Sequence, residues 1–133
     1  MRVVLDTNVL LSGLFVRGLC EAVLDVCVAS DTCTIVLSEY ILKEFERHAR
    51  KTFRASPHEV QKAVSFLRDC AELVVPAEVP AKTCRDSGDL PVLGTLLAGE
   101  ADGLITGDKD LLTLGEFKGR WILSPRQFYE RLK

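Results

Sequence analysis

Short apolar segments alternate with longer segments of helical periodicity along the whole chain. The apolar segments lie at residues 3–5, 33–37, 73–75, 103–106 and 121–123. Because they lack polar alternation, they predict strands that are buried on both faces, as in a parallel sheet. Apolar spacings of three and four predict helices between them, at residues 8–14, 19–28, 39–51, 57–70, 89–99, 109–114 and from 125 onward. This alternation predicts an α/β fold: a three-layer α/β/α sandwich with right-handed crossovers.

Capping signals support several of these helix boundaries. Ser38 is a suitable N-cap with Glu39 in the first turn, and Ser124 precedes Pro125 in the same way. Pro57 is well placed at the start of its helix. Pro91 is tolerated only because it falls in the first turn of the helix at 89–99.

Composition changes little in this picture. The 133 residues, 47% hydrophobic and 27% charged, contain no linker-like segment, so we expect one domain over residues 1–133. Five cysteines without a C-x-x-C pair indicate free thiols in a reducing cytoplasm. We expect no membrane span, since no stretch approaches ~20 apolar residues. Asp6 and Asn8 interrupt the N-terminal apolar run and argue against a secretory signal, so we expect a cytoplasmic protein.

The net charge limits the ways in which the protein could bind nucleic acid. The net charge of −2 argues against a protein that coats nucleic acid by bulk attraction. Any binding of nucleic acid would have to be local, or carried by metal ions.

Two predicted strands end at an acidic residue. Asp6 follows the first strand and Asp108 follows the fourth. In an open parallel sheet, ligands gather at the carboxyl ends of strands where the strand order reverses. The two carboxylates would face each other if the first and fourth strands are neighbours. Thr106 can donate a hydrogen bond there, and Gly107 allows close backbone approach. Alternatively, Asp108 only caps the helix that follows it.

Three further acids belong to segments that approach the same edge of the sheet. Glu44 lies at the border of the buried stripe of its helix, whereas Glu39 and Glu46 are expected to face solvent. Asp89 begins the helix that leads into the fourth strand, and Asp86 lies on the preceding loop. Alternatively, Glu44 is a solvated edge residue, and Asp86 or Asp89 serves only as a cap.

Carboxylates gathered at one edge repel one another. At ~4 to 6 Å, each close pair costs about 4 kcal/mol at an effective dielectric constant of about 20, so the cluster must take up protons or bind a cation. A ligand set of oxygen atoms without His or Cys favours Mg²⁺ or Mn²⁺. Such ions activate water and stabilise the leaving oxygen of a phosphodiester. The acids therefore predict metal-assisted hydrolysis of a phosphate ester.

A basic run follows Glu44 along the same helix. It comprises Arg47, His48, Arg50, Lys51 and Arg54. One explanation is a solvated helix end, where the helix dipole favours cations. The other is a track for RNA phosphates that leads to the metal, with the arginines and the lysine as the binding residues.

Four segments together resemble the PIN domain family. They are LDTNVLLSG (5–13), SEYILKEF (38–45), DSGDLPVLGTLLAGEADGLITGDKDLL (86–112) and ILSPRQFYERL (122–132). The most specific feature is D-T-N near the start with T-G-D-K-D-L-L about a hundred residues later. The likeness covers nearly the whole chain and is strongest to the branch of toxins from toxin–antitoxin pairs.

The resemblance implies a five-stranded parallel sheet in the order 3-2-1-4-5 and an endoribonuclease that depends on Mg²⁺ or Mn²⁺. By position, its catalytic and metal-binding acids match Asp6, Glu44, Asp89 and Asp108, with Asp86 as an accessory. Asn8 and Thr106 match its supporting polar positions, and Asn8 would orient Asp6.

For the reaction, the resemblance implies attack of water on RNA that leaves 5′-phosphate and 3′-hydroxyl ends. It also implies a protein antitoxin and a homodimer. Pro91 and Gly94 depart from the regular, alanine-rich helix that usually follows the acid at position 89.

Two other functions are compatible with parts of the sequence. A haloacid-dehalogenase-like phosphatase also places an aspartate after its first strand, but its chemistry needs a second acid where this chain has Asn8. A non-catalytic interaction module of the PIN fold, with structural acids, would hold a partner protein by its exposed faces. Binding of Mn²⁺ distinguishes the nuclease from the module, and a phosphoryl group trapped on Asp6 would identify the phosphatase.

Overall fold

A six-stranded sheet in the order β3-β2-β1-β4-β6-β5 forms the centre of the computed structural model, which describes residues 1–132. Its strands are β1 (Arg2–Leu5), β2 (Thr34–Leu37), β3 (Ala71–Leu73), β4 (Gly103–Ile105), β5 (Glu116–Phe117) and β6 (Arg120–Leu123). All neighbouring pairs are parallel except β5 and β6, which are antiparallel.

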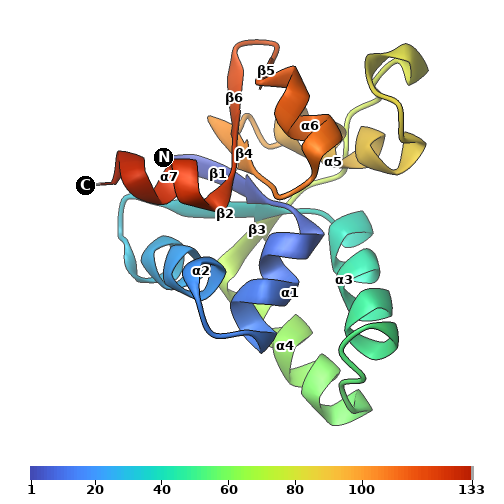
Figure 1. Cartoon of the computed structure of the whole chain (residues 1–133). Helices are drawn as coiled ribbons and strands as arrows, with labels where there is room; N and C mark the ends of the chain where they lie inside the picture. Colours follow the sequence, from blue (N-terminus) through green and yellow to red (C-terminus); the bar gives the residue numbers. More distant parts are fainter. Residues whose placement is uncertain (133) are drawn as a thin grey trace.

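Helices cover both faces of this sheet. They are α1 (Thr7–Phe15), α2 (Leu19–Ala29), α3 (Glu39–Lys51), α4 (Pro57–Cys70), α5 (Leu90–Ala98), α6 (Lys109–Leu114) and α7 (Pro125–Arg131), with 3₁₀ turns η1 (Ala81–Thr83) and η2 (Ser87–Asp89). In Figure 1, α1, α2, α3 and α4 lie below the sheet and α5 and α6 above it. The predicted α/β class and three layers are therefore confirmed.

The strand order implied by the resemblance recurs in the structure, but one strand was missed. The predicted fifth strand is β6, and the edge strand β5 joins it through a two-residue turn. That turn consists of Lys118 (φ 50°) and Gly119 (φ 80°), and positive φ at both positions matches the twist of a tight hairpin. A strand of only two residues is too short for a periodic signal, so the pattern could not reveal it.

The third strand forms two residues earlier than expected. The prediction was 73–75, whereas β3 begins at Ala71, directly after the end of α4. Ala71 is already extended, with φ −119° and ψ 153°. Val74 still donates from its backbone to Leu37, but Val75 leaves the sheet and is 86% exposed.

The two central strands are buried on both faces. Val3, Val4 and Leu5 of β1 and Leu104 and Ile105 of β4 have no exposed surface. The strands are parallel here, but they are added outward on opposite sides: β2 and β3 lie beyond β1, and β6 and β5 lie beyond β4. The gap between the carboxyl ends of β1 and β4 is thus the point where strand order reverses.

Gly94 explains why the helix after position 89 departs from a regular pattern. Ala77 donates a backbone hydrogen bond of 3.0 Å to the Gly94 carbonyl, so an extended segment lies directly on α5. A Cβ at Gly94 would come within 2.2 Å of the Ala77 carbonyl oxygen. The glycine is therefore required by a close backbone approach, and α5 still forms with Pro91 in its first turn.

All five cysteines are free thiols. Among residues 1–132, no helix is long and apolar enough to cross a membrane.

Candidate active site

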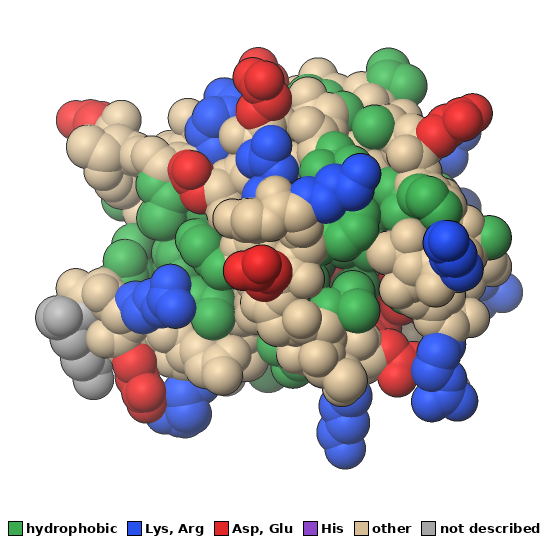
Figure 2. Space-filling view, turned by 90° about the horizontal axis from the view of Figure 1, so that it is seen from above, with side chains coloured by type: hydrophobic (Ala, Val, Ile, Leu, Met, Phe, Trp, Pro, Cys, Tyr) green, Lys and Arg blue, Asp and Glu red, His purple; other side chains and the backbone are tan. Residues whose placement is uncertain are grey.

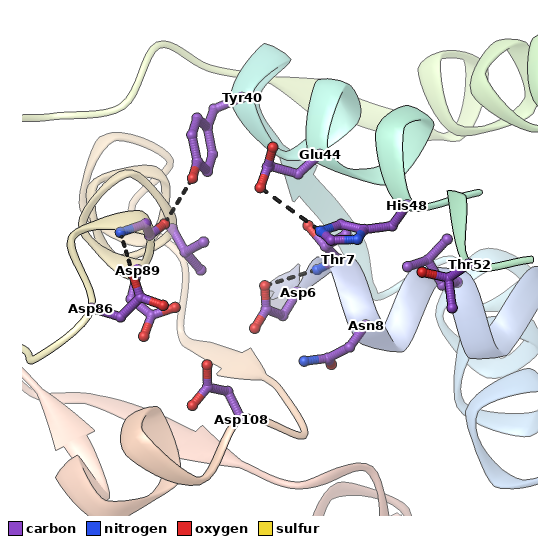
Figure 3. A pocket seen from close by; sticks show the side chains of 13 residues that line it. Asp6, Thr7, Asn8, Tyr40, Glu44, His48, Thr52, Asp86, Asp89 and Asp108 are labelled. Carbon is purple, nitrogen blue, oxygen red and sulfur yellow. Dashed lines mark hydrogen bonds and ion pairs between the residues drawn. The ribbon is translucent and has the colours of Figure 1, made fainter. Parts of the chain in front are cut away.

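A cavity of about 270 Å³ opens where β1 and β4 end. Acids from four separate segments line it (Figure 3), and they are Asp6, Glu44, Asp86, Asp89 and Asp108. Figure 3 shows Glu44 on α3 on one side of the cavity and the 86–89 turn on the other. The remaining lining residues are Thr7, Asn8, Leu11, Tyr40, His48, Thr52, Gly88 and Val92.

Asp6 is held by two hydrogen bonds at the end of β1. Its Oδ1 accepts from the backbone of Thr7 at 2.8 Å, and its Oδ2 accepts from the Thr106 hydroxyl at 2.6 Å. Only 6% of Asp6 is exposed. Burial raises the pKa of Asp6 although both hydrogen bonds oppose that shift. The fold therefore orients the carboxylate, but keeping it ionised in this buried position is unfavourable in free energy.

The same Thr106 hydroxyl also contacts the segment that carries Asp108. Its oxygen accepts from the Asp108 backbone at 3.0 Å. Asp108 Oδ1 in turn accepts from the Asp110 backbone at 2.8 Å and so caps α6. Capping and a place in the cavity are therefore compatible for Asp108, because one carboxylate oxygen serves the helix while the residue still lines the cavity.

Asp89 lacks the hydrogen bonds that its burial calls for. It is 7% exposed, and within the described chain its Oδ2 has no hydrogen-bond partner. Burial, followed by the charges of Asp108, Asp6 and Asp86, raises the pKa of Asp89 to about 7. Buried polar atoms are almost always paired in folded proteins. This oxygen therefore needs a proton or a cation.

Tyr40 joins α3 to the turn that carries Asp86 and Asp89. Its hydroxyl donates to the Gly88 carbonyl at 3.1 Å, and Asp86 Oδ1 accepts from the Gly88 backbone at 2.8 Å. Burial and the charge of Glu44 raise the pKa of Tyr40. Tyr40 was not predicted to line the site, although its position four residues before Glu44 puts both on one helix face.

His48 and Thr52 were not predicted to line the cavity. They follow Glu44 at intervals of four residues on α3 and its end, which is the signal that would have found them. The His48 Nε2 lies 4.0 Å from Glu44 Oε1. Glu44 also pairs with Arg47, at 2.9 Å from Oε1 to Nη2 and 3.2 Å from Oε2 to Nε.

The four cations of the predicted RNA track differ in their partners. Arg47 is paired with Glu44, and Arg50 with Glu46 at 3.1 Å. Two others are exposed and have no ion pair within the part of the chain described, and they are Lys51 and Arg54. Half of the predicted track is therefore neutralised by its own helix. Glu39 and Glu46 carry surface ion pairs, as expected of solvent-facing acids.

Asn8 makes a different contact from the one expected. Its Oδ1 accepts from the Gly107 backbone at 3.1 Å. It therefore ties the start of α1 to the loop after β4, while Thr106 and Thr7 orient Asp6.

The residues around the cavity supply the kind of ligand that a hard divalent cation prefers, but they lie too far apart to surround one. Among residues 1–132, no three His, Cys, Asp or Glu side chains are grouped closely enough to hold a metal ion. Apart from Asp89, each acid instead accepts a hydrogen bond from its own segment of the chain, as repulsion between carboxylates favours. The chemistry of the donor set is nevertheless oxygen only, and the unpaired Asp89 Oδ2 is an orphaned acceptor that a cation would satisfy.

The fold and the cavity define an α/β protein with an acidic site at the switch point of a parallel sheet. The chain belongs to the PIN domain family, whose profile matches residues 2–110. PIN domains are generally nucleases and typically use divalent metal ions.

A crystal structure supports the same fold over nearly the whole length. The chain is similar to VapBC2 from Rickettsia felis, solved bound to a DNA fragment from their promoter. The TM-score is 0.65 at 15% sequence identity, and the alignment covers 93% of this chain and 98% of that one. At this identity the likeness shows the fold alone. No curated protein matches the sequence.

Proposed function

We propose that this PIN domain is an endoribonuclease that uses Mg²⁺ or Mn²⁺. Asp6, Glu44, Asp89 and Asp108 would hold the ion, with Asp86 as an accessory ligand. The observation that carries the proposal is the buried, unpaired Oδ2 of Asp89 in a cavity lined by carboxylates from four separate segments. Such an arrangement is unfavourable without a cation, and its oxygen donors suit these two ions.

A bound ion would supply an activated water molecule and stabilise the leaving oxygen of the phosphodiester. The chain's own residues prepare the site. Thr106 and Thr7 hold Asp6 in one orientation, and the Asp110 backbone does the same for Asp108. Tyr40 holds the 86–89 turn across the cavity from Glu44.

RNA is the substrate that the resemblance to PIN-domain toxins implies, and basic residues next to the acidic site are placed to contact its phosphates. Lys51 and Arg54, which are exposed and unpaired in residues 1–132, are the members of the predicted track best able to contact phosphates. Arg47 and Arg50 would first have to leave Glu44 and Glu46.

A role as the toxin of a toxin–antitoxin pair is the biological setting we propose. It is supported by the resemblance of the sequence motifs to that branch of the family and by the shared fold with VapBC2. A protein antitoxin and a second copy of the chain are the partners that this setting implies.

The test compares RNA cleavage by the purified protein with and without Mn²⁺. Asp6→Asn and Asp108→Asn should each reduce cleavage at least about a hundredfold, because each removes an acid from the site. Asp25→Asn, an exposed acid on α2, is the matched control and should cleave like the parent.

Two results would contradict the proposal. Parent-like cleavage by both site variants would show that the acids are not catalytic. Absence of Mn²⁺ binding in calorimetry, together with no thermal shift, would favour a non-catalytic interaction module instead.

A further inference from the structure

A second groove lies beside the acidic cavity, between η1 and α6. It has a volume of about 440 Å³, and its walls are Lys82, Thr83, Cys84, Arg85, Asp110, Thr113 and Leu114. The proposed catalytic acids directly adjoin it: Arg85 precedes Asp86 in the chain, and the Asp110 backbone bonds to Asp108. A nucleic-acid strand bound in the acidic cavity would therefore be able to extend into this groove.

The groove offers cations that are not already neutralised. The Arg85 side chain is 88% exposed, and its one ion pair is a loose contact of 3.9 Å with Asp110. Lys82 is exposed and has no ion pair among residues 1–132. On the other side of the acidic cavity, by contrast, Arg47 is held by Glu44 through two hydrogen bonds.

The overall charge makes such local cations necessary. A chain of net charge −2 with acids at its active site repels a polyanion. On the face drawn in Figure 2, Lys and Arg side chains are scattered among Asp and Glu and do not form one broad patch. Affinity for a nucleic acid would thus depend on a few phosphate contacts close to the site.

The groove is also large enough for a sugar or base, and its side chains can contact either. Its volume falls within the range of small-ligand pockets, roughly 300–1,000 Å³. Leu114 is 37% exposed and supplies an apolar surface, and Thr83 supplies a hydroxyl. Positive charge at the rim and an apolar surface with hydroxyls suit one nucleotide of a single strand.

We propose that the groove between η1 and α6 binds the RNA nucleotide next to the cleaved bond, with Lys82 and Arg85 on its phosphates and Leu114 against its sugar or base. This inference rests on the proposed ribonuclease function. It assigns a substrate contact to the side of the cavity opposite the basic run on α3.

The test measures cleavage of a single-stranded RNA at a series of salt concentrations. The Lys82→Ala/Arg85→Ala double variant should raise KM about tenfold, as expected for two lost charged contacts, and leave kcat within about twofold. The slope of log KM against log salt should fall by about 0.7 for each lost phosphate contact on a single strand. When the two groove substitutions are added to the Asp6→Asn variant, its binding of the same RNA should weaken to a similar extent.

The matched control is Lys62→Ala/Arg126→Ala, which removes the same charge elsewhere. Lys62 is exposed on α4, and Arg126 on α7 is 73% exposed with an ion pair of 4.0 Å, much like Arg85. The control should keep the salt slope of the parent. Circular dichroism spectra of both doubles should match the parent.

Three outcomes overturn the inference, and they separate it from the proposed function. If the parent cleaves RNA but the groove variant shows the KM and slope of the control, the groove does not bind substrate. A loss confined to kcat likewise excludes a binding role. If the parent neither binds Mn²⁺ nor cleaves RNA, the ribonuclease function fails, and the groove inference with it.

Discussion

The Thr106 hydroxyl donates a hydrogen bond of 2.6 Å to Asp6 Oδ2, although the two residues are 100 positions apart in the chain. The same oxygen accepts from the Asp108 backbone at 3.0 Å. Thr106 is fully buried, so neither bond competes with water. One side chain thus sets both the orientation of one proposed metal ligand and the position of another.

Thr106→Val should weaken Mn²⁺ binding about 10- to 100-fold, the usual effect of losing a group that orients a metal ligand. Valine keeps the shape of threonine but cannot donate to Asp6. Thr106→Ser should recover most of the affinity because it restores the hydroxyl. Calorimetry measures the affinities, and equal Mn²⁺ affinity in the valine variant and the parent would contradict this role.

The contribution of Asp89 to the stability of the metal-free protein should decrease as pH rises from about 3.8 to about 7. Over that interval folded Asp89 holds a proton and an unfolded aspartate does not, so the folded state binds more protons. This contribution to the free energy of unfolding decreases through the window and levels off above it. Burial also raises the pKa of Asp6, which acts in the same direction.

Asp89→Asn should remove most of this pH dependence and stabilise the metal-free protein above about pH 7, since asparagine carries no charge to bury. Urea unfolding in the presence of a chelator at several pH values measures the effect. Mn²⁺ should stabilise the parent at the upper end of the range and the variant much less. A variant with the parent's slope would show that Asp89 is not the group that titrates.

Tyr40→Phe should loosen the turn that carries Asp86 and Asp89. The variant loses the hydrogen bond to the Gly88 carbonyl, worth about 1 kcal/mol, which corresponds to roughly fivefold faster amide exchange in the turn. Hydrogen exchange with peptide resolution measures this effect. Tyr129→Phe, on the helix α7 that packs against α2 and β6, should leave exchange in the turn unchanged.

Gly94→Ala should destabilise the fold by about 1 to 3 kcal/mol, the usual cost of forcing an extra methyl group into a packed site. Its Cβ would lie 2.2 Å from the Ala77 carbonyl oxygen, so the extended segment would have to leave α5. Gly107→Ala is the control, since its Cβ would meet Asn8 only at 3.5 Å. Urea denaturation compares the two variants, and equal midpoints would refute the packing argument.

The sequence predicted most elements correctly because their signals are local. Helix α4 begins at Pro57 and ends at Cys70 as expected, and α6 occupies the predicted residues 109–114. Proline at a first turn and apolar spacing act within a few residues of the chain. Strand β5 was not predicted because two residues are too few to show an apolar periodicity. Strand β3 was predicted two residues too late because apolar Val74 and Val75 follow it.

The candidate site was predicted less completely. Asp6 and Asp108 follow strands, so their position at one edge could be inferred from the sequence, and β1 and β4 do pair side by side. Tyr40 and His48 were missed because their place in the cavity depends on how α3 packs against the sheet and the 86–89 turn. Asn8 was placed near the site, but its contact with Gly107 could not be foreseen.

By itself, the sequence determined the alternation of strands and helices and the acids that end the two central strands, since periodicity and chain order act locally. Only the tertiary structure decided which of those acids share a cavity, that the Asp89 Oδ2 is buried without a partner, and that Arg47 is paired while Lys82 is unpaired among residues 1–132. These properties depend on burial and distances between segments far apart in the chain. Such distances are set by strand pairing and packing, which no local pattern records.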